Sequence, residues 1–335
     1  MSKHKTDLVI IGAGPAGLFA VFEAGMLKMK CHVIDSLEVI GGQCNALYPE
    51  KPIYDIPAYP SIMASELVDK LEEQAKPFEP TYHLNQRVDK LIENEDKTFD
   101  IVTSKGTEIN CKAVIIAAGC GAFGPNRPPL AGLEEFEGKS VFYAVKNKAK
   151  FQDKKVVIAG GGDSAVDWVL SLAEICEKLY VVHRRDKFRC APESADKMKK
   201  LAQEGKIEMV IPYQLEGLKG SNGDLEAVLV KDFSGNVKEL EANYLLPFFG
   251  LAMELGTIAD WGLNLDKKHI EVDPSNMTTS KSGIYAIGDI ATYKNKLKLI
   301  LTGFAEGASA CHDIHKIVFP DEVFHFEYST SKGVK

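Results

Sequence analysis

Two glycine-rich turns of the same kind occur in this chain, each directly after a run of apolar residues. The first, Gly12-Ala13-Gly14-Pro15-Ala16-Gly17, follows residues 7–11, and the second, Gly160-Gly161-Gly162-Asp163-Ser164-Ala165, follows residues 155–159. In such turns the first glycine permits a tight strand-to-helix turn, the second lets the backbone approach a pyrophosphate, and the last small residue allows close packing. The free N–H groups at the start of the helix then bind the anion. The sequence therefore predicts two dinucleotide-binding sites.

The next strand after each turn ends in a different kind of residue. Asp35 lies 23 residues after the first glycine of the first turn, whereas His183 holds that place after the second turn and is followed by Arg184, Arg185 and Arg189. An acidic side chain at this place hydrogen-bonds a ribose 2′-hydroxyl, and arginine accommodates a 2′-phosphate. We therefore expect FAD at the first site and NADPH at the second. A surface ion-pair cluster is the alternative role of the arginines.

The composition is typical of a soluble globular protein and argues against nucleic acid as the main partner. The chain has 335 residues, a formal net charge of −7, 45% hydrophobic residues and 26% charged residues, which are ordinary values for globular domains and argue against a nucleic-acid partner. The first expected strand begins at residue 7, which leaves no room for a signal peptide before it, and no apolar run reaches the ~20 residues of a membrane span. The seven cysteines contain no C-x-x-C pair, so we predict reduced thiols and a cytoplasmic location.

Short apolar runs alternate with longer amphipathic segments, which indicates an α/β fold. The proline-rich segment 121–132 suggests a crossing between domains, and residues 302–318 have helical periodicity. We therefore predict two Rossmann-like dinucleotide-binding domains, with the FAD-binding domain discontinuous and the NADPH-binding domain inserted. The predicted bounds are 1–121 for the first FAD-binding part, 122–248 for the NADP(H)-binding domain, and 249–335 for the second FAD-binding part with a C-terminal extension.

Further residues are candidates for contacts to a flavin. Gln43 follows Gly42 in the loop after the first Rossmann unit and can hydrogen-bond the flavin ring or ribityl chain, while Tyr48 can stack on the ring or simply pack. Asp289 at a strand end suits the ribityl hydroxyls, and a helix beginning near Thr302 could direct its N-terminus at the flavin. The sequence shows no triad, metal cluster or carboxylate pair, which fits hydride transfer because the cofactor carries that chemistry. We therefore predict no protein acid or base as the catalytic residue.

From residue 6 almost to its end, the chain resembles the flavoprotein reductases of thioredoxin reductase type. Disulfide reductases of that group carry C-x-x-C shortly before the second glycine-rich turn, but residues 142–150 contain no cysteine here. A thioredoxin reductase mechanism by that route is therefore excluded. The chain resembles more closely the thioredoxin-reductase-like ferredoxin–NADP⁺ reductases, through residues 41–51 and the extension 324–335.

This resemblance implies a homodimer and additional contacts to FAD. Tyr48 would stack on one face of the flavin and Tyr328, in the segment Glu327-Tyr328-Ser329-Thr330-Ser331, on the other. Thr330 would contact FAD, and Val88 and Phe123 would lie beside its nucleotide half. From the residues alone, a frayed tail is the alternative for 324–335.

The candidate site residues form two sets. Those predicted to bind FAD are Gly12, Gly14, Ala16, Gly17, Asp35, Gly42, Gln43, Tyr48, Val88, Phe123, Asp289, Tyr328 and Thr330. Those predicted to bind NADPH are Gly160, Gly162, Asp163, Ser164, Ala165, His183, Arg184, Arg185 and Arg189.

The resemblance implies a ferredoxin–NADP⁺ reductase, in which hydride passes from NADPH to FAD and single electrons then pass to an acidic carrier, ferredoxin or flavodoxin. Lysine clusters within 146–155 and 294–298 could bind such a carrier, although a solvated face is the alternative. An alternative enzymatic function is that of an NADPH-dependent reductase or oxidase of quinones, small disulfides or oxygen. A non-catalytic redox sensor that binds FAD and NADP(H) is the remaining alternative.

Overall fold

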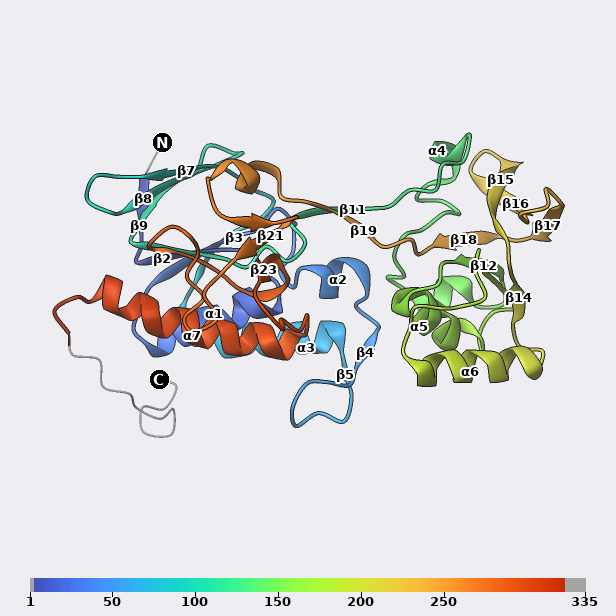
Figure 1. Cartoon of the computed structure of the whole chain (residues 1–335), viewed down its shortest axis with the longest axis horizontal. Helices are drawn as coiled ribbons and strands as arrows, with labels where there is room; N and C mark the ends of the chain where they lie inside the picture. The colour runs from blue at the N-terminus through green and yellow to red at the C-terminus, as the bar shows by residue number, and fades with distance from the viewer. Residues whose placement is uncertain (1–2, 323–335) are drawn as a thin grey trace. The chain divides into compact units, whose positions relative to one another are not determined.

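The chain forms two compact units (Figure 1). The computed structural model describes residues 3–322. Unit 1 comprises residues 1–123 with 253–335, and unit 2 comprises residues 124–252. The chain leaves unit 1 within strand β11 (Ala122–Pro125) and returns within strand β19 (Leu251–Glu254). The assignment of one cofactor to each domain, with the bounds given above, stays a prediction.

Unit 1 is built on a five-stranded parallel sheet with the strand order β22-β10-β2-β3-β6. Its strands are β2 (Leu8–Ile11), β3 (Cys31–Ile34), β6 (Thr81–His83), β10 (Ala113–Ile116) and β22 (Ile284–Ala286). Successive side chains of a strand point to opposite faces of the sheet, so Leu8 and Ile10 join one buried cluster while Val9 and Ile11 join another. Because both faces are covered, the strands are continuous apolar runs rather than alternating ones.

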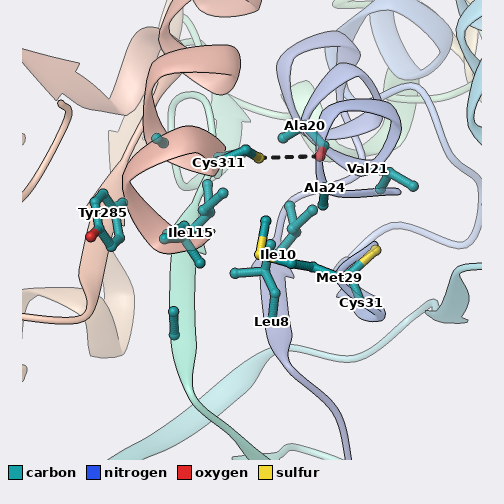
Figure 2. Close-up of a cluster of buried hydrophobic side chains, with 14 of the residues drawn as sticks. Leu8, Ile10, Ala20, Val21, Ala24, Met29, Cys31, Ile115, Tyr285 and Cys311 are labelled. Carbon is teal, nitrogen blue, oxygen red and sulfur yellow. Dashed lines mark hydrogen bonds between the residues drawn. The ribbon is translucent and has the colours of Figure 1, made fainter. Parts of the chain in front are cut away.

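Helices α1 (Pro15–Met26) and α7 (Ile300–Val318) lie side by side, and α3 (Ala64–Ala75) packs beside α1 (Figure 1). Figure 2 shows Cys311 of α7 facing Ala20 of α1, where its thiol donates a 3.4 Å hydrogen bond to the Ala20 carbonyl oxygen. Glycine makes this close approach possible, since a Cβ at Gly303 would lie 3.0 Å from the Cβ of Ala16. These two helices and the strands bury one continuous core.

The opposite face of the parallel sheet is covered by a second sheet with the order β1-β9-β8-β7. Its strands are β1 (Lys3–Lys5), β7 (Val88–Glu93), β8 (Phe99–Thr103) and β9 (Glu108–Cys111). Phe99, Ile101 and Ile109 of this sheet pack against Val9 and Val114 of the parallel sheet. Unit 1 is thus a three-layer structure of helices, parallel sheet and smaller sheet.

Unit 2 repeats the arrangement on a smaller scale. Its parallel sheet has the order β14-β13-β12-β18, with β12 (Lys155–Ala159), β13 (Lys178–Val182), β14 (Glu208–Val210) and β18 (Tyr244–Pro247). Helices α5 (Asp163–Leu172) and α6 (Pro192–Gln203) pack together. An antiparallel sheet of β15 (Gln214–Ser221), β16 (Asp224–Lys231) and β17 (Val237–Glu241) shares a core with the parallel sheet. The predicted α/β class is confirmed.

Short elements complete the described residues. They are α2 (Gln43–Leu47), β4 (Pro52–Ile53), β5 (Ile62–Met63), α4 (Leu133–Phe136), β20 (Leu265–Asp266), β21 (His269–Glu271), β23 (Ala291–Thr292), and the 3₁₀ helices η1 (Lys76–Phe78), η2 (Lys148–Phe151), η3 (Gly256–Asp260) and η4 (Gly288–Ile290). Of these, α2 and η4 carry predicted FAD-binding residues, and η4 contacts α7.

Two candidate nucleotide-binding sites

Unit 1 contains a cavity of about 290 Å³ at the carboxyl ends of its parallel strands, the edge where open α/β sheets bind ligands. Ile11, Ile34 and Ala117 mark those strand ends in its wall. The predicted FAD-binding residues that line it are Gly12, Gly14, Ala16, Asp35, Gly42, Gln43, Tyr48, Val88 and Asp289. The structure therefore brings together residues from both sequence halves of unit 1. Their individual contacts to FAD stay predictions.

The three glycines of the first turn serve different purposes. A Cβ at Gly12 would lie 2.3 Å from the Ala117 carbonyl oxygen, and one at Gly17 would lie 2.0 Å from the Gly12 oxygen, so both positions exclude side chains by packing. A Cβ at Gly14 would meet only the Gly42 Cα, at 3.9 Å. Gly14 also lines the cavity and precedes the first turn of α1. The space kept open there fits a pyrophosphate against free helix N–H groups.

Asp35 is buried at the end of β3 and already accepts two backbone hydrogen bonds. Its carboxylate oxygens accept from the Ala13 N–H at 2.6 Å and from the Leu37 N–H at 2.8 Å. Burial raises the pKa of this carboxyl, and these N–H groups oppose that rise by favouring the charged form. Asp35 therefore ties the first glycine-rich turn to the loop after β3, and its remaining lone pairs face a cavity that a ribose could enter.

Gln43 and Tyr48 also line the cavity. The Gln43 side-chain amide donates a 3.4 Å hydrogen bond to the Cys120 thiol, which leaves its carbonyl oxygen to accept from a ligand. Burial raises the pKa of the Tyr48 hydroxyl, and the Cys44 thiol raises it further. A protonated phenol ring in the cavity wall is suited to stacking on a flat ligand.

The loop between η4 and α7 is held by a buried ion pair. The Glu306 carboxylate of α7 accepts the Gly288 backbone N–H at 2.7 Å and the Tyr293 hydroxyl at 2.7 Å, and it pairs with the Lys296 ammonium. The Glu306 and Lys296 side chains are 3% and 5% exposed. Lys296 is therefore not available to a protein carrier, contrary to the role suggested for its lysine cluster. Asp289, next to Gly288, is held at the cavity as a consequence.

The N-terminus of α7 also borders the cavity. The helix begins at Ile300 rather than near Thr302, and Leu299 and Ile300 line the cavity wall. The first N–H groups of this helix have no intrahelical partners, so their dipole favours negative charge nearby.

Sequence reasoning missed several residues of the cavity wall. Gln86, Arg87, Thr257 and Lys298 line it, and the Thr257 hydroxyl donates a 2.6 Å hydrogen bond to the Val88 carbonyl. They lie in loops and in η3, where no nucleotide-binding motif occurs; Lys298 was assigned only to a lysine cluster for a carrier. Among the remaining predictions, Gly17 packs behind the wall, while the Phe123 side chain, Tyr328 and Thr330 lie outside the described residues.

The second glycine-rich turn lies in unit 2 at the start of α5. A Cβ at Gly160 would lie 2.5 Å from the Phe248 carbonyl oxygen and 3.0 Å from the Ala165 Cβ, so this glycine and the small Ala165 are needed for packing. A Cβ at Gly162 would meet nothing within 4 Å. Ser164 and Asp163 are exposed in the first turn of α5. Gly162 thus repeats the open position of Gly14, with the same fit to a nucleotide phosphate.

The arginine turn is tied to this glycine-rich turn by backbone hydrogen bonds. The Arg189 N–H donates to the Gly161 carbonyl at 2.6 Å, and the Ala191 N–H donates to the Asp163 carboxylate at 3.0 Å. Arg184, Arg185 and Arg189 are exposed beside it. The Asp163 carboxylate therefore has a structural role in addition to its predicted contact with NADPH.

His183 packs against the second glycine-rich turn. A Cβ at Gly161 would lie 2.2 Å from its imidazole ring, and Phe188 stacks on it at 4.8 Å between centroids. Burial lowers the pKa of His183, and the three arginines lower it further. A neutral imidazole supports the turn, so the positive charge predicted to bind a 2′-phosphate would come from the arginines.

Other chemical sites are absent from the described part of the chain. Within residues 3–322, no group of three His, Cys, Asp or Glu side chains is placed to hold a metal ion. All seven cysteines are free thiols. No helix in the same range is long and apolar enough to cross a membrane.

Comparison with known proteins identifies the family. The model of the pyridine nucleotide-disulphide oxidoreductases matches residues 6–307. The chain belongs to this family. It is similar to the protein of Rickettsia felis named ferredoxin–NADP reductase, with 61% identity over 329 residues and 98% of each chain covered. The protein of the same name from Wolbachia pipientis wMel is 58% identical over 331 residues, again with 98% of each chain covered.

Solved structures show the same architecture. Thioredoxin reductase of Lactococcus lactis is 28% identical, with a TM-score of 0.80 and coverage of 94% of this chain and 99% of that chain. Thioredoxin reductase of T. acidophilum is 25% identical, with a TM-score of 0.81 and coverage of 93% and 98%. The predicted resemblance and the thioredoxin-reductase-like fold with two dinucleotide-binding domains are confirmed.

Proposed function

We propose that this protein is a ferredoxin–NADP⁺ reductase, with FAD as its resident cofactor and NADPH as its reductant. The observation that carries this proposal is the identity of about 60%, over 98% of the chain, with relatives named ferredoxin–NADP reductase. FAD accepts hydride from NADPH and passes on single electrons, which is the chemistry that such a reductase needs. The chain belongs to an oxidoreductase family, so it is an enzyme rather than a sensor.

The chain's own residues hold the two nucleotides. In unit 1, Gly14 keeps the place of a pyrophosphate open at the start of α1, and Asp35 and Asp289 both line the cavity. In unit 2, Gly162 leaves space for a phosphate of NADPH, and the exposed Arg184 binds its 2′-phosphate. Their chemistry fits these cofactors, because a helix N-terminus binds phosphate and arginine recognises a 2′-phosphate.

The arrangement of thiols favours a protein carrier over a disulfide substrate. Residues 142–150 contain no cysteine, and each of the seven cysteines is unpaired in the structure. Burial raises the pKa of Cys44 to about 11 and also raises that of Cys120, the two thiols nearest the cavity. Thiols held protonated are poor nucleophiles toward a disulfide. Quinones and oxygen remain alternative acceptors, which the assay below separates.

We propose an acidic carrier, ferredoxin or flavodoxin, that docks through exposed lysines. Lys294 is exposed in the loop before α7, close in sequence to residues of the cavity wall. In unit 2, Lys146 and Lys154 are exposed, whereas Lys155 pairs with Glu241 at 2.7 Å. Lys294→Glu should therefore raise the KM for ferredoxin at low salt and leave ferricyanide reduction unchanged. An equal loss with both acceptors would contradict docking at this loop.

We further propose a cytoplasmic homodimer in which the C-terminal segment of one subunit, with Tyr328 and Thr330, covers the flavin of the other. Unit 1 has exposed apolar side chains that a second subunit could cover, among them Tyr54, Leu297 and Leu301. Sedimentation should give twice the chain mass. Tyr328→Ala should change the flavin absorption spectrum, whereas a monomer with an unchanged spectrum would rule out both proposals.

The function is tested by steady-state NADPH oxidation with three acceptors. The purified protein is assayed with ferredoxin coupled to cytochrome c, with thioredoxin, and with menadione. Fast turnover that requires ferredoxin supports the proposal. Turnover with menadione or oxygen alone assigns the chain to the reductases that deliver electron pairs, and no turnover with any acceptor contradicts an enzymatic function.

A further inference from the structure

Lys298 lines the cavity near Gln43, one of the candidate flavin contacts. Among the described residues, four charged residues line the cavity, namely Asp35, Arg87, Asp289 and Lys298. Asp289 and Lys298 both act electrostatically on Cys120, the hydrogen-bond partner of Gln43. Both residues therefore lie near Gln43, and Lys298 supplies positive charge there.

A specific partner holds the Lys298 side chain. Its ammonium lies 2.7 Å from the Nε2 atom of His269 in β21. An ammonium can only donate, so Nε2 accepts and the ring proton is on Nδ1. The His269 ring also makes a hydrogen bond with the Asp266 backbone. The chain Asp266–His269–Lys298 thus gives a flexible lysine one defined place beside the cavity, next to the N-terminus of α7.

We propose that Lys298 stabilises negative charge on the reduced cofactor, and that His269 is the positioning residue that holds Lys298 for this purpose. The proposal rests on the proposed function, because it assumes that FAD occupies the cavity. A fixed positive charge and a helix N-terminus at one wall act in the same direction, and charge placed in advance needs no reorganisation when electrons arrive. Lys298 is exposed and also lines the cavity, and we assign it to the cofactor site.

His269 makes this arrangement sensitive to pH. Burial lowers its pKa, and the Lys298 ammonium lowers it further, while Asp266 and Asp289 act in the opposite direction. These are the ionisable groups facing His269 from the elements packed against β21, because β23 contributes only Ala291 and Thr292. A protonated His269 could not accept from Lys298 and would repel it. The stabilisation of the reduced cofactor should therefore weaken in acid, below the ordinary histidine pKa of about 6.5.

The test is a redox titration of the FAD-loaded protein at pH 7.5, followed by flavin absorbance. Lys298→Met should lower the ratio of reduced to oxidised FAD at a fixed potential about tenfold, which is about 30 mV for a two-electron couple. Lys298→Arg, which retains the charge, should restore most of this ratio. Lys294→Met is the matched control in the same loop and should leave the ratio within about twofold of the original protein. A ratio that Lys298→Met leaves unchanged would overturn the proposal.

His269→Gln tests the positioning role, because glutamine offers an acceptor that does not titrate. At pH 7.5 the flavin potential of His269→Gln should match that of the original protein. Between pH 7 and 5 the ratio of reduced to oxidised FAD in the original protein should fall toward the ratio in Lys298→Met. In His269→Gln this ratio should stay above that of Lys298→Met. Identical pH profiles would overturn the role of His269. Failure of the proposed function would instead appear as no bound FAD or no ferredoxin reduction, so the two failures are distinguishable.

Discussion

Glu306 and Gly288 are joined by a 2.7 Å hydrogen bond from the Gly288 N–H to the buried carboxylate. The same carboxylate pairs with Lys296, so a single side chain of α7 connects the strand end that carries Asp289 to the loop that carries Lys298. Both of those residues line the cavity. The buried Glu306 therefore holds in place the wall of the candidate FAD site that contains Asp289 and Lys298.

Glu306→Leu should destabilise the protein by about 3–5 kcal/mol, because it leaves the Lys296 ammonium buried without a partner. Glu306→Leu combined with Lys296→Met removes both charges. The double variant should recover part of this loss and remain about 1–3 kcal/mol below the original protein, since the Gly288 N–H still lacks an acceptor. Urea unfolding measures the stability of the single and double variants. If the double variant were no more stable than Glu306→Leu, the buried charge of Lys296 would not be the cause of the destabilisation.

Gly14→Ala and Gly17→Ala should separate cofactor binding from folding. The Gly14 position has φ −74° and open space, so the alanine variant should fold with unchanged stability, while FAD binding weakens about tenfold or more because the pyrophosphate cannot approach. At Gly17 a Cβ would lie 2.0 Å from a backbone oxygen, so that variant should lose roughly 1–3 kcal/mol even without FAD. Thermal melts of the apoprotein measure stability, and titration with FAD measures cofactor affinity. If both substitutions lowered stability and FAD affinity equally, the separate roles of Gly14 and Gly17 would be contradicted.

Arg184→Ala should raise the KM for NADPH roughly 10- to 100-fold, because a hydrogen bond to a charged group contributes about 1.5–3 kcal/mol. NADH lacks the 2′-phosphate, so its KM should hardly change. Arg127→Ala is a suitable control, since that exposed arginine of unit 2 is occupied by Glu134 and Glu137. Initial rates measured over a range of NADPH and NADH concentrations give both KM values. An equal rise in the KM for NADH would contradict recognition of the 2′-phosphate by Arg184.

Three histidines should make unit 1 sensitive to acid. His32 donates to or accepts from His83 at 2.9 Å, and the His4 ring lies 5.4 Å from each. Burial, together with the neighbouring His83 and His4, lowers the pKa of His32 to about 4. The unfolded state then binds more protons, so the stability from this group is complete above the unfolded pKa of about 6.5 and is lost as pH falls toward 4.

The variant His32→Asn tests this pH dependence. Its urea midpoint should fall less between pH 8 and pH 5 than that of the original protein, because it lacks the group with the lowered pKa. An equal fall in both proteins would show that other groups cause the acid sensitivity.

Local sequence was sufficient to predict the fold class, both glycine-rich turns and the residues at the ends of the following strands. Those signals are short in range: a buried parallel strand is a continuous apolar run, and a strand-to-helix turn around a phosphate needs glycine at set positions. The same spacing predicts separate purposes for Gly12, Gly14 and Gly17, and the structure shows close packing at Gly12 and Gly17 and open space at Gly14.

Only the tertiary structure decided what the neighbouring lysines 296 and 298 do. They lie two residues apart in one loop, yet Lys296 is buried against Glu306 while Lys298 borders the cavity and bonds His269. A loop has no periodicity that fixes the direction of a side chain. The partners, Glu306 and His269, lie 10 residues after Lys296 and 29 residues before Lys298, and no motif links them to the loop. For the same reason Gln86 and Thr257 could not be assigned to the cavity wall before folding brought their loops together.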